Sequence, residues 1–309
     1  MIKVLFLSGS EISIPLFDTL LHDNRFEIVG FVMQPDKIMN RGQKIQESFL
    51  KKTVSKSHIR IFQPEKLFND QMLYNQFLKN RPDLLLTFAY GQLLDEKWLG
   101  LPVLYPINIH ASILPKYRGA SPINASVLNG DNEMGISVMK MVKKMDAGPV
   151  LEIIKFPVFA NMNLSELVQL ISEKSAELVP DILAKIDENS IFVEQDSENI
   201  SYTTKINKQD AFIDFSESAD VVYRKFLAYY GWPQIWSKFK GKSLKLLDIE
   251  KSDATSEPGL VSCTDGQISI GCSKGSILLN LLHPESKKPM LATDFVRGQP
   301  DFCGSQLPS

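Results

Sequence analysis

The alternation of short apolar runs with helix-like stretches, which fills the first half of the chain, is the sequence feature that most limits its fold. Apolar runs lie at residues 3–7, 27–33, 83–87 and 105–110, and those at 135–141 and 149–156 are further strand candidates. Helix-like patterns lie among them, at residues 14–21 and 72–79. Short buried strands separated by helices are typical of a mainly parallel sheet with helices on both faces. We therefore expect a Rossmann-like α/β fold.

The second half of the chain has a different pattern. A long helix is expected at 163–185, where Asn163 can cap the first turn and Glu166 follows three residues later. A polar stretch, 187–208, precedes another expected helix at 219–228. Short strand-like pieces then follow one another at 237–239, 243–249, 259–262, 267–271 and 276–282, a pattern that indicates a small, OB-like β-barrel. We expect two domains, residues 1–190 and 208–309, joined by a linker at 191–207.

The composition is that of an ordinary soluble protein, with 44% hydrophobic residues, 23% charged residues and a formal net charge of −2. The total charge does not indicate a nucleic-acid partner, so any basic surface must be local. No apolar stretch reaches about 18 residues, and we expect no membrane span. The apolar start is too short for a signal peptide. These observations favour a cytoplasmic protein.

Three cysteines lie in the last fifty residues: Cys263, Cys272 and Cys303. Their odd number and wide spacing argue against a disulfide scaffold, and no Cys/His cluster indicates a metal. We expect three free thiols and no metal site.

The common nucleotide-binding motifs are missing. The first expected strand is followed by Ser8-Gly9-Ser10 rather than by G-x-G-x-x-G, and no G-x-x-x-x-G-K-[ST] occurs. The chain thus combines a nucleotide-binding type of fold with no nucleotide signature.

Two polar side chains lie at the end of the fourth apolar run. Strand residues two apart point the same way, so Asn108 and His110 face one side at the carboxyl edge of the sheet, where ligands bind. An amide donor beside an imidazole suits a carbonyl oxygen that becomes an oxyanion. Asp146, farther along the chain, could orient the imidazole or accept a proton, and Gly148 would permit a close approach to a ligand. The alternative is that Asn-x-His is a turn or capping feature.

The wider sequence favours catalysis. The segment NIHASILPKYRGASPI, residues 108–123, together with MDAGPVL, residues 145–151, closely resembles the signature of the folate-dependent formyltransferases. The resemblance implies that Asn108, His110 and Asp146 form the catalytic set. It also implies that Ser112, Ile113, Leu114 and Pro115 contact the folate. Ala111 departs from the glycine of most members, for which we expect only a slight local adjustment.

The same resemblance implies a reaction and its co-substrate, 10-formyltetrahydrofolate. An amine attacks the formyl carbon, Asn108 and a protonated His110 stabilise the oxyanion, and Asp146 holds His110 and assists proton removal. We expect the pterin against the loop that contains Phe88, Tyr90 and Gly91 and against the segment that begins at Val142. No metal is required, because folate carries the activated carbon.

A basic segment indicates which amine is used. Residues 36–60 hold seven Lys and Arg against two acids, a local charge of +5 that a phosphate backbone would neutralise. Gln34-Pro35-Asp36 and residues 40–44 resemble the inserted loop of the formyltransferases that act on methionyl-tRNA. There the arginine that matches Arg41 contacts the tRNA acceptor end, and we include Lys44 in this contact. The alternative is a solvated surface segment.

The C-terminal part supports the same interpretation. Residues 214–216, 223–233 and 242–249 resemble the C-terminal domain of these enzymes, and residues 221–247 hold six Lys and Arg and no acid. Basic residues near aromatics on a small barrel suit tracking of a nucleic-acid backbone and stacking of its bases. Most of the aromatics are needed for the core, so we expect at most two exposed. The aromatic residues of this stretch are Tyr223, Phe226, Tyr229, Tyr230, Trp232, Trp236 and Phe239.

The sequence therefore predicts a monomeric enzyme that formylates the α-amino group of methionyl-initiator tRNA. Two alternatives stay open. An amino-sugar formyltransferase would act on a sugar nucleotide and ignore tRNA, and its second domain would serve assembly. A non-enzymatic tRNA-binding protein would require a damaged catalytic set, whereas Asn108, His110 and Asp146 are intact by residue type.

Overall fold

The structure is a computed structural model that describes residues 1–36, 38–39, 44–45 and 47–308. The chain forms two compact units. Unit 1 comprises Met1–Pro122, Glu133–Pro157 and Leu167–Thr204, and unit 2 comprises Ile123–Asn132, Val158–Glu166 and Lys205–Ser309. Each unit therefore contains segments that are far apart in the sequence.

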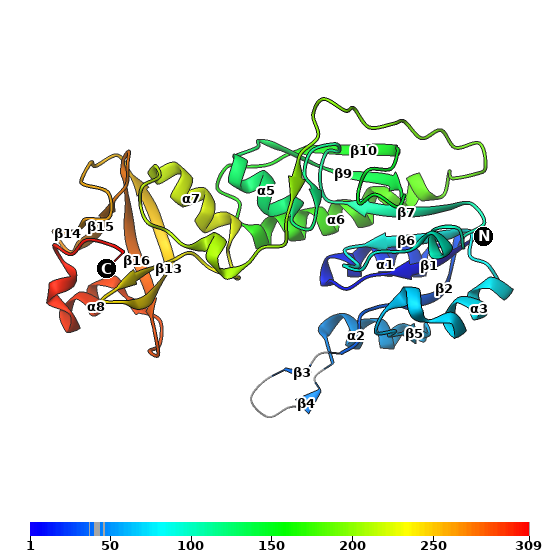
Figure 1. Ribbon diagram of the computed structural model, residues 1–309, viewed down its shortest axis with the longest axis horizontal. Helices are drawn as coiled ribbons and strands as arrows, with labels where there is room; N and C mark the ends of the chain where they lie inside the picture. The colour runs from blue at the N-terminus through cyan, green and yellow to red at the C-terminus, as the bar shows by residue number, and fades with distance from the viewer. Residues whose placement is uncertain (37, 40–43, 46, 309) are drawn as a thin grey trace. The chain divides into compact units, whose positions relative to one another are not determined.

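Unit 1 is built on a seven-stranded sheet with the order β10-β9-β7-β6-β1-β2-β5 (Figure 1). Its strands are β1 (Ile2–Leu7), β2 (Phe26–Val32), β5 (Ile61–Phe62), β6 (Leu84–Phe88), β7 (Tyr105–His110), β9 (Glu133–Lys140) and β10 (Val150–Pro157). All neighbours pair in parallel except at β9, which is antiparallel to both β7 and β10. The predicted mainly parallel sheet is confirmed.

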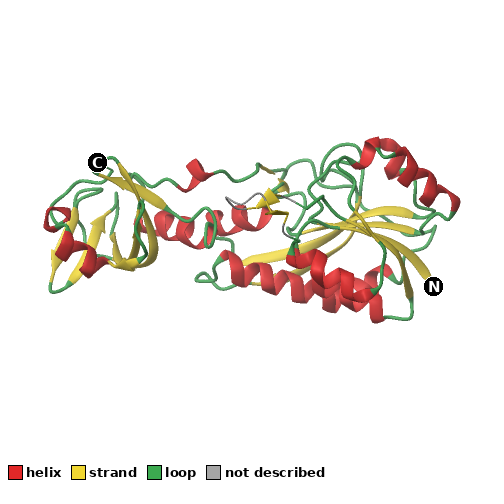
Figure 2. Ribbon diagram, turned by 90° about the horizontal axis from the view of Figure 1, so that it is seen from below, coloured by secondary structure: helices red, strands yellow, loops and turns green. Residues whose placement is uncertain are grey.

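Helices lie on both faces of this sheet (Figure 2). They are α1 (Ile14–His22), α2 (Phe49–Val54), α3 (Gln71–Lys79), α4 (Glu96–Leu99) and α6 (Leu164–Leu183), with 3-10 turns η1 (Glu11–Ser13), η2 (Ser55–Ser57) and η3 (Leu67–Asn69). Alternate residues of β1 point to opposite faces. Leu5 and Leu7 pack with Phe77 of α3, while Phe6 stacks on Phe31 and meets Phe17 of α1 edge-on. Two apolar layers thus fix β1 at the centre of the sheet.

Two-stranded pairings complete unit 1. They join β3 (Ile38–Met39) to β4 (Lys44–Ile45) and β8 (Arg118–Gly119) to β11 (Tyr202–Thr203). The second pair brings residues from the predicted linker alongside the segment that follows β7. The linker prediction itself stays a prediction.

Unit 2 contains a curled antiparallel sheet with the order β12-β13-β16-β15-β14, and β17 also pairs with β16. Its strands are β12 (Trp236–Phe239), β13 (Lys242–Ser252), β14 (Val261–Thr264), β15 (Gln267–Gly271), β16 (Ser276–Pro284) and β17 (Met290–Leu291). Its helices are α7 (Ala219–Ala228), α8 (Ala292–Gly298) and most of α5 (Pro122–Asn129), with 3-10 turns η4 (Lys208–Ala211) and η5 (Pro300–Phe302). The predicted small C-terminal barrel is confirmed.

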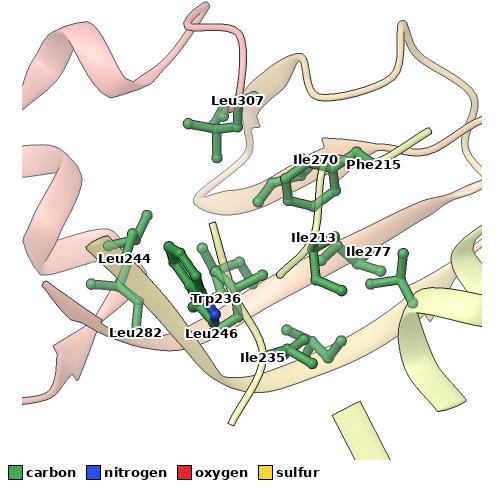
Figure 3. Packing of buried hydrophobic residues seen from close by; sticks show 14 of the residues in the cluster. Ile213, Phe215, Ile235, Trp236, Leu244, Leu246, Ile270, Ile277, Leu282 and Leu307 are labelled. Carbon is green, nitrogen blue, oxygen red and sulfur yellow. The ribbon is translucent and has the colours of Figure 1, made fainter. Parts of the chain in front are cut away.

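The core of unit 2 is aliphatic and aromatic. Phe215, Trp236 and Leu246 contribute side chains to this core from different segments (Figure 3). α5 joins this unit through polar contacts: Arg224 Nε donates to the Leu128 carbonyl at 2.9 Å, and Asn124 Nδ2 donates to the Ala228 carbonyl at 2.6 Å.

The expectation of three free thiols is wrong for two of them. Cys263 and Cys303 form a disulfide with Cα atoms 5.7 Å apart, and Cys272 is free and buried. The sequence conceals this pairing because the chain end returns to β14: Val261 N donates to the Ser305 carbonyl at 2.9 Å, and Gly304 N donates to the Val261 carbonyl at 2.8 Å. Cys263 and Cys303 are separated by 40 residues in the sequence and meet only because the chain end pairs with β14.

The start of α6 follows the predicted cap. Asn163 Oδ1 accepts from Glu166 N at 3.2 Å, and Glu166 Oε2 accepts from Asn163 N at 2.8 Å. Two amide donors of the first turn are thereby satisfied. Within the described residues, no helix is both long enough and apolar enough to cross a membrane.

Candidate active site

The carboxyl ends of β6 and β7 bring three polar side chains to one edge of the unit 1 sheet. Thr87 lies opposite Asn108 in the parallel register of the two strands, and His110 follows on the same side of β7. The hydroxyl of Thr87 donates to Asn108 Oδ1 at 2.7 Å. The amide of Asn108 is therefore oriented with its NH₂ group directed away from Thr87.

Asp146 lies in the loop between β9 and β10 and faces both predicted partners. Its Oδ1 is 3.5 Å from Asn108 Nδ2, and its Oδ2 is 3.7 Å from His110 Nδ1. The amide of Gly119 donates to the same Oδ2 at 2.7 Å. The structure thus brings Asn108, His110 and Asp146 together, although they come from two separate segments.

The imidazole of His110 is held between two acceptors and is only 5% exposed. Nε2 lies 2.9 Å from the carbonyl oxygen of Tyr117, which can only accept, so Nε2 carries a hydrogen. Nδ1 faces the carboxylate of Asp146. A doubly protonated ring satisfies both neighbours, and a singly protonated ring satisfies only the carbonyl.

The predicted folate-contacting segment turns its first polar side chain inward. Ser112 is buried, and its hydroxyl donates to the Lys116 carbonyl at 2.7 Å. Ser137 of β9 donates to the Ser112 carbonyl at 2.7 Å and accepts from Leu114 N at 3.1 Å. Leu114 is also buried, whereas Ile113 and Pro115 are half-buried. The side chains of Ile113 and Pro115, and the main chain, are what this segment offers to a ligand.

The loop after β6 also offers main chain rather than side chains. Phe88 and Tyr90 are 1% and 4% exposed, and Tyr90 packs in the core around Leu5 and Trp98. Its hydroxyl has no hydrogen-bond partner among the described residues, and burial raises the pKa of this phenol. The Tyr90 carbonyl accepts from Gln34 Nε2 at 2.9 Å, and Gly91 has φ +76°, where glycine is favoured.

Val142 differs from these buried residues because its side chain is 38% exposed. Met145, the residue before Asp146, is also exposed. These two apolar side chains on the Asp146 loop give a surface that a flat aromatic ring could cover.

Gly148 has a different neighbour from the one expected. A Cβ at this position would lie 1.9 Å from the carbonyl oxygen of Lys140, at the end of β9. The close approach that requires glycine is therefore to the protein's own backbone.

Two contributors to the site were missed by sequence reasoning: Thr87 and Gln195. Thr87 could have been found, because parallel strands that end together place their last residues side by side. Gln195 lies in the polar stretch predicted to be a linker, and no local sequence pattern distinguishes it from its neighbours. Its Nε2 donates to the carbonyls of Asp146 and Gly148 at 2.8 and 2.7 Å.

The basic segment is described only in part. Arg41 lies outside the described residues, and Lys44 belongs to the short strand β4. Lys51 bonds to Asp36 at 2.5 Å and lies 3.5 Å from Glu47, the two acids of this segment. The hydrogen bond from Lys51 lowers the pKa of Asp36. One lysine thus pairs with both acids.

The aromatic stretch of unit 2 exposes two side chains, as expected: Tyr230 and Trp232, with exposed fractions of 46% and 60%. The other five are buried or half-buried. Tyr230 meets Phe226 edge-on at 6.4 Å, so the exposed ring rests on the core.

Comparison with known proteins identifies the family. The formyl transferase family matches residues 2–183, and the formyl transferase C-terminal domain matches residues 205–300. The chain belongs to the formyl transferase family. The chain is 33% identical to the methionyl-tRNA formyltransferase of a Sulfurihydrogenibium species over 99% of each chain.

Two solved structures share the fold of this formyl transferase. A methionyl-tRNA formyltransferase from Clostridium thermocellum has a TM-score of 0.58 at 12% identity, with 90% of this chain and 99% of that chain covered. An N-formyltransferase from Helicobacter canadensis, in complex with folinic acid and dTDP-3-aminofucose, has a TM-score of 0.65 at 16% identity, with 90% and 99% covered. Both units of the formyl transferase are therefore found together in known structures.

Proposed function

We propose that this formyl transferase moves the formyl group of 10-formyltetrahydrofolate to the α-amino group of methionyl-initiator tRNA. The observation that carries the proposal is the match over 99% of both chains to a methionyl-tRNA formyltransferase, in a chain where Asn108, His110 and Asp146 converge. The product is N-formylmethionyl-tRNA, which serves translation initiation. The enzyme works in the cytoplasm as a monomer.

Asn108 is the donor best placed for the oxyanion. Its Oδ1 is occupied by the Thr87 hydroxyl, and its Nδ2 carries two hydrogens, of which Asp146 can accept one. The other is available when the amine attacks the formyl carbon and the carbonyl oxygen becomes negative. Loss of one such donor typically costs about 10²–10³ in rate.

His110 contributes positive charge beside the same oxygen. Its Nε2–H is engaged by the Tyr117 carbonyl, and the second hydrogen of the protonated ring points to Asp146. Asp146 keeps the ring in this orientation and assists removal of the proton that the attacking amine must lose. As the new C–N bond forms and the bond to folate N10 breaks, one proton leaves the amine and one reaches N10, so the step balances without an external acid.

The residues beside Asp146 fit the folate co-substrate. Val142 and Met145 expose apolar surface, and the neighbouring loop presents its main chain because Phe88 and Tyr90 are buried. We assign the pterin to the space bounded by Val142 and by the loop up to Gly91, with Ile113 and Pro115 on the opposite segment. Ser112 and Leu114 support that segment from inside.

The tRNA is assigned to two basic regions. In the first, Arg41 and Lys44 contact the acceptor end; in the second, the basic residues near Tyr230 and Trp232 follow the backbone. On this assignment, residues 1–190 catalyse, residues 208–309 bind tRNA, and residues 191–207 connect them. The Arg41→Ala variant should use tRNA less efficiently while binding folate normally. Unchanged tRNA KM and kcat would remove Arg41 from the mechanism.

The deciding experiment incubates the purified protein with 10-formyltetrahydrofolate and either methionyl-initiator tRNA or a dTDP-linked amino sugar. Formylation of the tRNA alone is expected. Formylation of the sugar alone would assign the chain to the amino-sugar enzymes, and tRNA binding without either product would make it a binding protein. Charged elongator tRNA is the matched control for initiator specificity.

A further inference from the structure

The loop that carries Asp146 adopts a backbone conformation that needs support. Asp146 has φ +49°, in the left-handed region that residues with a Cβ rarely occupy. Conformations of this kind persist where the surrounding structure holds them. The contacts of the Asp146 main chain therefore decide where its carboxylate lies relative to His110.

Gln195 supplies those contacts. One Nε2–H donates to the Asp146 carbonyl at 2.8 Å, and the other donates to the Gly148 carbonyl at 2.7 Å. Both hydrogens of a single amide are thus used on the two ends of the same short loop. Gln195 is half-buried, which strengthens these bonds relative to bonds in open water.

Arg118 fixes Gln195 in turn. The Oε1 of Gln195 accepts from Arg118 Nε at 3.0 Å and from Arg118 Nη2 at 2.8 Å. Arg118 is buried, and its planar guanidinium leaves the amide only one orientation that gives every atom a suitable partner. The hydrogen-bond chain therefore runs from Arg118 through Gln195 to the Asp146 loop.

The segment that carries Gln195 also reaches the other side of His110. We call residues 193–203 the return segment. Val193 and Val150 exchange main-chain bonds at 2.8 Å, which anchors its start beside β10. Near its end, Ser201 accepts from Tyr117 N through its hydroxyl at 2.8 Å and from Arg118 N through its carbonyl at 2.9 Å.

The return segment thus touches both groups that engage the imidazole. Tyr117 provides the carbonyl at Nε2, and Asp146 provides the carboxylate at Nδ1. Gly119, whose amide holds Asp146, is packed so closely against the segment that a Cβ would lie 2.2 Å from the Thr203 carbonyl oxygen. The segment predicted from composition as a linker has the contacts of a structural part of the site.

We propose that Gln195 is a positioning residue for formyl transfer: it fixes the Asp146 loop so that the carboxylate meets His110 and Asn108 in a productive geometry. The inference rests on the proposed function, because its activity readout is formyl transfer. A misplacement of about 1 Å can cost 10²-fold in rate. We expect kcat to fall by about 10- to 100-fold when the two donors are removed, with the folate KM changed less than about threefold.

Two variants separate the donors from the packing. Gln195→Met keeps the length of the side chain and removes all its hydrogen bonds. Gln195→Glu keeps an acceptor for Arg118 and removes both donors to the Asp146 loop. Gln169→Met, at an exposed position of α6 outside the site, is the matched control. Thermal midpoints and circular dichroism identify any variant that fails to fold, and kcat is compared among folded proteins.

A double-variant cycle tests whether Gln195 acts through Asp146. In the Asp146→Asn background, adding Gln195→Met should lower kcat by less than about twofold, because the group that Gln195 positions has already lost its charge. A full additional 10-fold loss would overturn the proposal, and so would wild-type kcat in Gln195→Met and Gln195→Glu.

Amide exchange at Gly119 provides a readout that does not depend on the reaction. Gly119 N–H donates to Asp146 Oδ2, so release of the Asp146 loop in Gln195→Met should accelerate its exchange by about 10-fold or more. Unchanged exchange would contradict the positioning role. If the wild-type protein formylates nothing while this acceleration is observed, the proposed function fails and the structural coupling stands.

Discussion

The two sheets of this protein differ in how the buried hydroxyls of serine and threonine are bonded, although the buried Tyr90 hydroxyl of unit 1 also lacks a partner among the described residues. At the carboxyl edge of the unit 1 sheet, buried side chains are joined by hydrogen bonds: Thr87 to Asn108, Ser137 to the Ser112 main chain, and Arg118 to Gln195. In the unit 2 sheet, the hydroxyls of Ser237 and Ser276 are buried without a partner among the described residues.

The difference reflects what holds each region in place. A polar network with every member bonded fixes atoms to within a fraction of an ångström, which formyl transfer requires. An apolar core such as that around Phe215 and Trp236 is held by packing, which is less directional and tolerates an unbonded hydroxyl. Mutations should therefore have different signatures in the two sheets.

The largest effect should come from His110. If His110 acts as proposed, the His110→Ala variant loses its contribution to oxyanion stabilisation, and kcat should fall by about 10²–10⁴-fold. Folate affinity, measured by titration with tetrahydrofolate, should stay within about threefold, because the ring is bonded to Tyr117 and Asp146 rather than exposed. Loss of folate binding would mean that His110 supports the fold of the site instead.

A matched pair of serines tests the comparison directly. Ser137→Ala leaves the buried Leu114 N–H and Ser112 carbonyl unbonded and should lower the free energy of unfolding of unit 1 by about 1–3 kcal/mol. Ser237→Ala removes a hydroxyl that has no partner in the described part of the chain, and it should be neutral or slightly stabilising in unit 2. Urea unfolding curves measure both. Equal losses would mean that the two sheets do not differ in this respect.

A smaller effect is expected at Thr87. In Thr87→Val the shape is kept and the bond to Asn108 Oδ1 is lost, so kcat should fall by about three- to tenfold, equivalent to about 1 kcal/mol. Thr87→Ser retains the hydroxyl and should remain near the wild-type rate. Steady-state kinetics at saturating folate distinguish the two variants. Identical kcat values for Thr87→Val and Thr87→Ser would mean that the hydroxyl does not contribute to the rate.

The smallest effect concerns Cys272. Desolvation raises the pKa of its thiol to about 11, so at pH 8 only about a thousandth is thiolate and iodoacetamide should react very slowly with the folded protein. After unfolding without reductant, the mass should rise by one adduct, because Cys263 and Cys303 are joined. Two or three adducts would contradict the disulfide.

Much of the fold could be predicted because its local signals agree with the tertiary structure. The strand expected at 105–110 is β7, and the helix expected at 219–228 is α7. In both, the apolar period matches the buried face, so no tertiary contact has to override it. The two-residue strand β5 was missed, since two residues carry no measurable period.

The site was predictable as far as residue type and order determine it. Asn108 and His110 share a strand, so their common face follows from the two-residue period. The contact of Asp146 with them required the family resemblance, because β9 separates it from β7. Gln195 and the disulfide could not be predicted, since both depend on where a loop or the chain end returns, and hydrogen bonds of that kind leave no periodic trace.

Unit 2 includes a helix from an earlier part of the chain, which limits how this protein can be divided into fragments. Arg224 and the Ala228 carbonyl are bonded to α5, which is encoded about a hundred residues earlier. A gene fragment that starts at residue 205 would encode the whole sheet and yet omit these partners. Transplanting the C-terminal unit onto another formyl transferase therefore requires transferring α5 as well, and recombination between relatives should keep the two segments from the same parent.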